Sequence, residues 1–122
     1  KNLKQKIIHL KSSTRRKSIY LKCVNSLHLD RFENNFFDKI VTDPPWGLFE
    51  DMGMDVSGFY YLMLQGFYSI LKVNGVIVVL TARKKEFEDV IFEFKSKLKL
   101  DKKYQILVSG KKAGIFKIIK LR

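Results

Sequence analysis

Apolar residues along this chain follow two spacings, one typical of strands and one typical of helices. Short runs rich in β-branched and aromatic residues predict strands at 18–24, 36–42 and 76–81. Two further strands are predicted at 104–109 and 115–121, and the turn between them is short enough for an antiparallel pair. The run at 76–81 is apolar at almost every position, which is typical of a strand that is covered on both faces.

Elsewhere apolar residues return every three or four positions, which predicts amphipathic helices. One helix is predicted at 2–10, and a longer one is predicted to start from Ser57 as N-cap and to stop at Asn74-Gly75. The longer helix is expected to bury Phe59, Leu62, Met63, Phe67, Ile70 and Leu71. A third helix is expected to bury Phe87, Val90, Ile91, Phe94 and Leu98. Strands alternating with helices predict an α/β sheet that ends in an antiparallel strand pair.

Composition supports one folded domain over 1–122, because 46% of the 122 residues are hydrophobic. No apolar run approaches the roughly 20 residues that a membrane-spanning helix needs, so no membrane partner is expected. A lone cysteine, Cys23, excludes an internal disulfide framework and favours the cytoplasm. Cys23, His9 and His28 do not have the spacing of an ordinary metal site, so no metal is expected.

The formal net charge of +12 is unevenly distributed. Residues 1–22 hold eight Lys or Arg and no acid, and residues 95–122 hold ten with Asp101 as the one acid. Residues 23–94 hold six basic and eleven acidic residues. Basic ends around an acidic centre favour a polyanion such as RNA, because cationic side chains displace the counterions of phosphates. The alternative is an ordinary lysine-rich surface in contact with solvent.

The candidate chemistry lies in Asp43-Pro44-Pro45-Trp46, directly after the strand at 36–42. Sites in open α/β sheets form beyond such strand ends. An exocyclic base amine could donate one N–H to the carboxylate of Asp43 and the other to the backbone carbonyl of Pro44. These two bonds would direct the nitrogen lone pair at an electrophilic methyl group. Trp46 offers a flat face for a flipped-out base, although the same residues also fit a plain Pro-Pro turn with a core tryptophan.

This motif and its context resemble a known family. Asp43-Pro44-Pro45-Trp46 is similar to motif IV of the S-adenosylmethionine-dependent amino-methyltransferases, and the Leu-Lys-x-x-Gly turn at 71–75 is similar to theirs. The likeness is greatest to the THUMP-associated RNA guanine-N2 methyltransferases (UPF0020), which the segment at 81–87 also resembles. The resemblance implies a Rossmann-like class I methyltransferase sheet, S-adenosyl-L-methionine as cofactor, and methylation of guanine N2 in tRNA or other structured RNA.

The resemblance also implies site residues. Asp43, Pro44, Pro45 and Trp46 would be catalytic, and the cofactor would contact Asp43 together with Asn25 and Ser26. The substrate would contact Trp46, Gly47, Arg83 and Lys84. Asn25 stands where the family has an aspartate, so the contact with the adenine amine would lack the charge.

The glycine-rich turn through which the family holds its cofactor is absent upstream of Ser18. We therefore expect 1–122 to be a C-terminal part of the catalytic domain that lacks the N-terminal cofactor-binding strands. A preceding segment or a partner chain would complete the sheet.

Two other functions remain open from the sequence. The same Asp-Pro-Pro-aromatic chemistry serves adenine-N6 methyltransferases that act on DNA or RNA. A truncated RNA-binding domain without activity could also keep the motif. Of the remaining candidates, Glu50, Asp51 and Asp55 are interpreted as solvated loop acids. The aromatic residues at 59–68 are interpreted as core rather than as a base-stacking surface.

Overall fold

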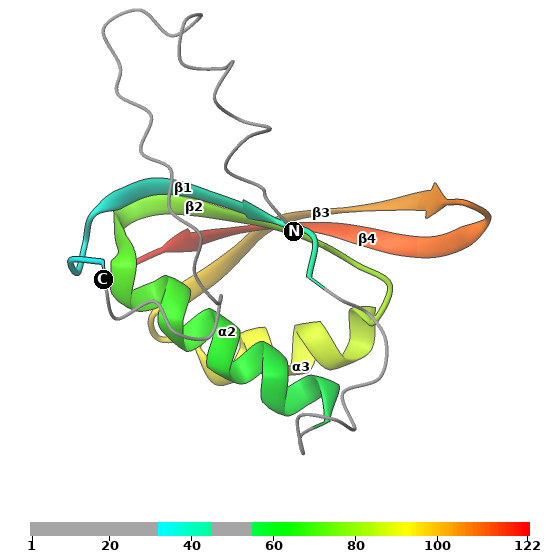
Figure 1. Cartoon of the computed structure of the whole chain (residues 1–122), viewed down its shortest axis with the longest axis horizontal. Coiled ribbons are helices and arrows are strands. Elements are labelled where there is room, and N and C mark those ends of the chain that lie inside the picture. Colours follow the sequence, from blue (N-terminus) through cyan, green and yellow to red (C-terminus); the bar gives the residue numbers. More distant parts are fainter. Residues whose placement is uncertain (1–31, 45–54) are drawn as a thin grey trace, which may run out of the picture.

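The computed structural model of the chain describes residues 32–44 and 55–122. The helix predicted at 2–10 and the strand predicted at 18–24 lie outside the described residues. The elements are β1 (Phe37–Thr42), α2 (Val56–Ile70), β2 (Leu71–Thr81), α3 (Lys84–Glu93), β3 (Leu98–Val108) and β4 (Lys111–Lys120). The strands form one sheet in the order β1-β2-β4-β3, with β1 and β2 parallel and the other pairs antiparallel (Figure 1). The predicted α/β sheet with an antiparallel end is confirmed.

Both described helices cover the same face of the sheet (Figure 1). Helix α2 buries positions three or four apart, which places one apolar stripe against the strands. That stripe consists of Val56, Phe59, Tyr60, Met63, Leu64, Phe67 and Ile70. Alternate residues of β2, among them Ile77 and Val79, are fully buried beneath it. The core therefore lies between the helices and this face.

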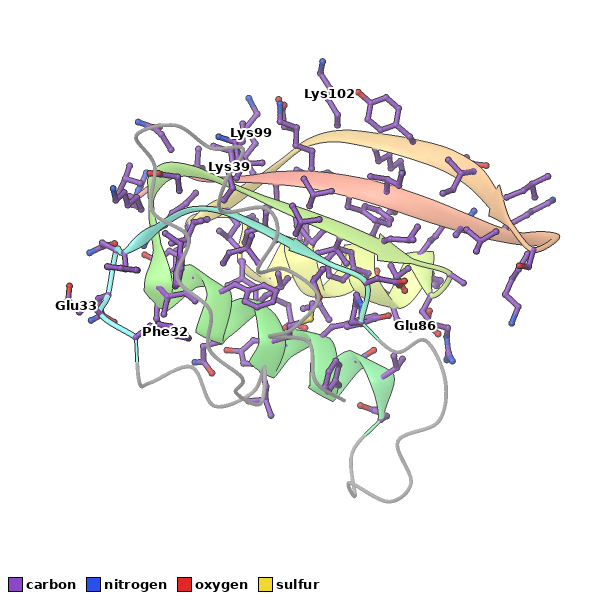
Figure 2. All side chains as sticks on the ribbon, turned by 45° about the horizontal axis from the view of Figure 1, so that its top comes forward. Phe32, Glu33, Lys39, Glu86, Lys99 and Lys102 are labelled. Atoms are coloured by element: carbon purple, nitrogen blue, oxygen red, sulfur yellow. The ribbon has the colours of Figure 1, made fainter. Side chains whose placement is uncertain are left out.

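No described element covers the opposite face of the sheet. Lys39, Lys99 and Lys102 project from it, away from the helices (Figure 2). Lys39, Val76, Ile119 and Lys99 are paired across the four strands in one row, so the apolar Val76 and Ile119 lie between the two lysines on this face. This second apolar face explains why the strand at 76–81 is apolar at successive positions.

Helix α2 begins differently from the prediction. Its N-cap is Asp55, whose Oδ1 accepts a hydrogen bond from the backbone N–H of Gly58 at 2.8 Å. Ser57 is already inside the helix, so the predicted N-cap was wrong, and Asp55 is a cap rather than a free loop acid. The predicted burial of Leu62 was also wrong, because its side chain is 42% exposed while Leu64 is fully buried.

The helix ends before the predicted stop at Asn74-Gly75. It ends at Ile70, and residues 71–75 already belong to β2. Phe37 pairs with Leu71 and Lys39 with Val76, so three extra residues of β2 bulge out between these pairs. A Cβ on Gly75 would lie 2.7 Å from both Leu71 Cγ and the carbonyl oxygen of Lys72. Gly75 therefore permits the close approach of this bulge rather than ending a helix.

The last two strands are longer than the sequence pattern predicts. Leu98, expected on helix α3, is the buried first residue of β3. The turn between β3 and β4 contains two residues, Ser109 and Gly110, with φ angles of 51° and 79°. Two positive φ angles match the type I′ turn, whose twist suits a tight hairpin.

A buried lysine stabilises the end of the sheet opposite the turn between β3 and β4. Lys120, at the end of β4, is 4% exposed. Its ammonium donates to Asn35 Oδ1 at 2.9 Å, to the carbonyl of Tyr68 at 2.8 Å and to the carbonyl of Leu71 at 2.7 Å. It thereby joins β4 to the C-terminal end of α2, where helix carbonyls lack partners within the helix.

Candidate functional site

The candidate site lies where the two parallel strands end. Asp43 and Pro44 follow β1 directly, and Thr42 lies beside Val79 of β2. Asp43 is exposed and Pro44 is buried, so the carboxylate faces solvent while the proline is fixed by the fold. The predicted site residues Asn25, Ser26, Pro45, Trp46 and Gly47 lie outside the described residues.

The end of β2 supplies the second part of the site. Thr81 is fully buried, and its Oγ1 accepts a hydrogen bond from the backbone N–H of Arg83 at 3.0 Å. Arg83 in turn donates from Nη2 to Oε2 of Glu86 at 3.1 Å, and Lys84 is the first residue of α3. The connection from β2 to α3 contains only residues 82–83, so Arg83 and Lys84 are held at the carboxyl edge of the sheet.

Tyr60 of helix α2 links these parts. Its hydroxyl and Oγ1 of Thr81 are hydrogen-bonded at 2.5 Å, and both residues are fully buried. Burial raises the pKa of Tyr60 above its ordinary value of 10.0, against the hydrogen bond with Thr81 and the charge of Arg83, which lower it. The charges of Glu86 and Asp43 raise this pKa further. The phenol of Tyr60 therefore stays neutral at physiological pH.

Glu86 is the acidic member of this cluster. The hydrogen bond from Arg83 is the largest cause that lowers its pKa below 4.5, and its own backbone N–H adds to the effect. Its carboxylate therefore stays charged at neutral pH and holds the Arg83 guanidinium in place. We name Asp43, Tyr60, Thr81, Arg83 and Glu86 the strand-end cluster.

The sequence identified Asp43 and Arg83, and the structure brings them to one edge. Tyr60, Thr81 and Glu86 were missed. A usable signal existed for Thr81, which is the one hydroxyl at the end of an otherwise apolar run. Tyr60 falls within a buried helical stripe, where an aromatic residue is most simply interpreted as core. The core interpretation of the aromatic residues is confirmed for Phe59, Tyr60 and Phe67 and is wrong for Tyr61, which is 38% exposed.

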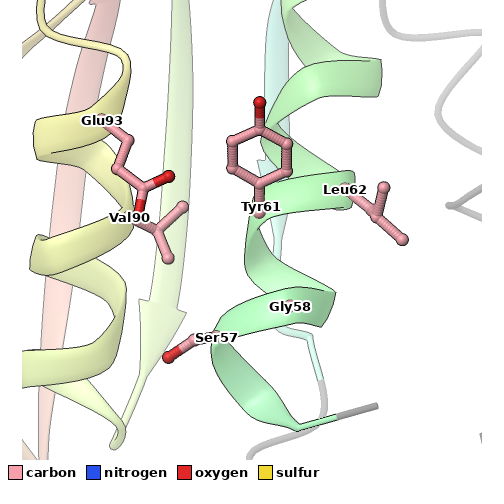
Figure 3. Close-up of a pocket in the computed structure, with 6 residues that line it drawn as sticks. All are labelled: Ser57, Gly58, Tyr61, Leu62, Val90 and Glu93. Atoms are coloured by element: carbon pink, nitrogen blue, oxygen red, sulfur yellow. The ribbon is translucent and has the colours of Figure 1, made fainter. Parts of the chain in front are cut away.

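A groove on the outer side of the helical layer is separate from this cluster. It lies between α2 and α3, has a volume of about 440 Å³, and is lined by Ser57, Gly58, Tyr61, Leu62, Val90 and Glu93 (Figure 3). None of these residues belongs to the strand-end cluster. Within residues 32–44 and 55–122, no group of three or more His, Cys, Asp or Glu could hold a metal ion.

Comparison with known proteins identifies relatives. A family model, UPF0020, described as RMKL-like, methyltransferase domain, matches residues 3–112. No curated protein matches the chain. TrmN from Thermus thermophilus superposes with a TM-score of 0.69 at 24% identity, over 84% of this chain and 29% of that one.

Two further structures show the same fold. NSun6 from Pyrococcus horikoshii, solved with SFG, superposes with a TM-score of 0.66 at 16% identity, over 100% of this chain and 40% of that one. The N-methyltransferase NodS from Bradyrhizobium japonicum WM9, solved with S-adenosyl-L-homocysteine, gives 0.62 at 17% identity, over 99% and 64%. The predicted Rossmann-like sheet is thus confirmed, and the chain spans less than two thirds of each of these proteins. No helix in the described part of the chain is long and apolar enough to span a membrane.

Proposed function

Because this chain belongs to the UPF0020 family of RMKL-like methyltransferase domains, we propose that it carries the amine-binding part of a methyltransferase acting on an exocyclic base amine. The substrate class is RNA, and the target is guanine N2 in tRNA or another structured RNA. The observation that carries the proposal is the position of Asp43-Pro44, directly after a parallel strand and beside the polar end of β2.

The chemistry follows from the acceptors at this edge. Asp43 accepts one N–H of the target amine, and the carbonyl of Pro44 accepts the other. The proline ring fixes the backbone torsion that aims this carbonyl. The nitrogen lone pair, no longer drawn fully into the ring, then points away from the two acceptors toward the methyl donor. Trp46 stacks on the base, which is typically worth about 1–3 kcal/mol.

The proposed cofactor is S-adenosyl-L-methionine, which supplies a methyl group on a positively charged sulfur. Among the described residues, Asp43 fits this cofactor. It is an exposed residue at the carboxyl end of the parallel strands, where ligands of such folds bind. Asn25 and Ser26 are proposed as further contacts. NodS, a structural relative, was crystallised with S-adenosyl-L-homocysteine.

The test is methyl transfer by the complete protein. It is incubated with S-adenosylmethionine carrying a labelled methyl group and a pool of unmodified tRNA transcripts, and the digested nucleosides are identified by mass spectrometry. We expect N2-methylguanosine. The variant Asp43→Asn keeps the shape of the side chain and removes its charge, so it should lose about 10²-fold or more in kcat.

A matched control is Asp38→Asn, which removes an exposed carboxylate from the same strand and should leave kcat unchanged. Detection of N6-methyladenosine instead would show that the target base is adenine and would overturn the assignment of guanine. Absence of any methylated nucleoside, with RNA still bound, would favour a binding domain without activity. Full activity of Asp43→Asn would remove Asp43 from the reaction.

A further inference from the structure

The β3–β4 hairpin extends beyond the rest of the sheet. Thr81, the last residue of β2, pairs with Gly114, whereas Lys111, Lys112 and Ala113 pair only with β3. At about 3.4 Å per residue, these three pairs project about 10 Å beyond the end of β2. We name residues 106–113 the hairpin arm, and Figure 1 shows it projecting past the other strands.

The arm projects at the end of the sheet where Asp43 lies. Strands β1 and β2 are parallel, so Asp43 and Thr81 lie at carboxyl ends on the same edge of the sheet, and the arm projects from Gly114, which pairs with Thr81. The turn of positive φ angles at Ser109 and Gly110 closes the arm tightly. A paired, tightly closed arm loses little conformational freedom when it binds a ligand.

The charge of the arm has one sign. Its eight residues, 106–113, contain Lys111 and Lys112 and no acid. Lys111 and Lys112 at the tip are exposed and have no ion pair among the described residues. In contrast, Lys103 is neutralised by Glu88 at 2.6 Å. The uncompensated charge of the arm is therefore concentrated at its tip.

A groove leads from the arm back to helix α3. It has a volume of about 280 Å³ and is lined by Lys84, Lys85, Glu88, Lys103, Tyr104, Gln105, Gly114 and Phe116. Two of the three lysines that line the groove have acidic partners, since Lys85 pairs with Asp89 at 3.4 Å and Lys103 pairs with Glu88. The third, Lys84, has no acidic partner among the described residues. A Cβ on Gly114 would lie 3.2 Å from Lys84 Cδ, so the stem of Lys84 runs along the base of the arm.

Lys84 and the arm share one side of the sheet. Gly114 pairs with buried Thr81 on the side of the helices, and Lys112, two residues earlier on the same strand, points to that side too. Lys111 points to the other side, so the two lysines flank the tip. Unpaired ammonium groups thus run from the start of α3 to the tip of the arm, beside the end of the sheet that carries Asp43.

The geometry points to a phosphate-binding track, formed by Lys84, Lys111 and Lys112, that holds the RNA backbone next to the base presented to Asp43. This inference rests on the proposed function for the identity of the polyanion. Several unpaired cations at a projecting arm suit the phosphates of a polynucleotide, whose contacts position the chain without reading its sequence. Lys84 holds the backbone near the reacting base, and the tip lysines hold it farther along.

The test compares two double variants of the complete protein. Lys111→Ala with Lys112→Ala removes two charges from the arm. Lys95→Ala with Lys97→Ala removes two exposed lysines from the turn before β3, at the other end of that strand. Binding of unmodified tRNA transcripts is measured by fluorescence anisotropy over a range of KCl concentrations. Steady-state methylation gives kcat and the KM for RNA.

For the arm variant we expect the log–log salt slope to become shallower by about 1.4, or about 0.7 for each lost phosphate contact. At about 0.15 M salt this corresponds to roughly tenfold weaker binding and a KM raised to match, with kcat unchanged. The control variant should keep the slope and KM of the parent protein. The arm variant should unfold at the parent's temperature, because Lys111 and Lys112 are exposed. The control variant loses the contacts of Lys95 with the Phe92 ring and of Lys97 with the Tyr68 ring, so binding is compared at a temperature at which both variants are folded.

An arm variant with the parent's salt slope and KM would overturn the track while methyl transfer continued, so the proposed function would survive. A control variant that weakens binding as much as the arm variant would show a general charge effect and also overturn the track. If polyglutamate displaces the RNA from the parent protein but not from the arm variant, the arm binds an acidic protein partner instead, and the track is overturned. Absence of both RNA binding and methyl transfer in the parent protein would overturn the proposed function itself.

Discussion

Replacing Lys120 by methionine tests how the sheet is fastened to helix α2. The ammonium of Lys120 donates to Asn35 Oδ1 and to the carbonyls of Tyr68 and Leu71, at 2.7–2.9 Å. It also lies 4.2 Å from the centre of the Tyr68 ring. Methionine keeps most of the length and apolar volume of lysine but offers no hydrogen to these acceptors. The variant therefore removes the bonds with little change in packing.

The expected loss of stability is a sum of opposed contributions. The carbonyl of Leu71, whose bond to Lys120 is buried, would lose its partner at a cost of about 1–3 kcal/mol. The lost attraction to the Tyr68 ring adds about 0.5–2 kcal/mol. Against this, the variant no longer buries a charge, a penalty already visible in the pKa of Lys120, which burial lowers below 10.5. We expect a net loss of about 2–3 kcal/mol, since water can reach the other two acceptors in part.

Urea unfolding followed by circular dichroism measures this difference. The control is Lys117→Met, a lysine of the same strand whose bridge to Asp101, at 3.4 Å, is partly exposed. An exposed bridge of this kind is worth about 0–1 kcal/mol. Equal stabilities of the Lys120 and Lys117 variants would refute the reasoning, because burial would then make no difference to the value of these bonds.

Two further predictions concern the bulge and the strand-end cluster. Gly75→Ala should lower the free energy of unfolding by about 1–3 kcal/mol, because the new Cβ would meet Leu71 Cγ and the Lys72 carbonyl at 2.7 Å, whereas Gly66→Ala inside helix α2 serves as the control in urea unfolding. Glu86, whose pKa is lowered by Arg83, contributes stability above pH 4.5 that is lost as the pH falls through its folded-state pKa. The variant Glu86→Gln should therefore show a shallower loss of stability in acid than the parent protein, and parallel acid titrations of the two would contradict this role.

The order of the elements and the position of Asp43-Pro44 directly after a strand could be predicted from local pattern alone. Alternating apolar residues identify strands, three-to-four spacing identifies helices, and two consecutive prolines must end a strand. These signals depend only on neighbours in the sequence. The helix boundaries of α2 were mispredicted because Asp55 and Ser57 are both good caps, and only the burial of Tyr60 and Leu64 selects the phase of the helix.

Contacts between distant residues could not be predicted in this way. Tyr60 meets Thr81 across 21 positions, and Lys120 meets Asn35 across 85. Nothing in either local pattern distinguishes these residues from an ordinary core tyrosine or a surface lysine. The register that extends β4 beyond the end of β2, and so projects the hairpin arm at the edge of the sheet where Asp43 lies, is likewise a property of the assembled sheet. The sequence by itself determined the alternation of elements and the Asp-Pro-Pro-Trp motif, because short-range sterics and periodicity encode them. The tertiary structure alone decided which lysine is buried and which ones lie on the projecting hairpin arm, because burial and register depend on partners brought together only by folding.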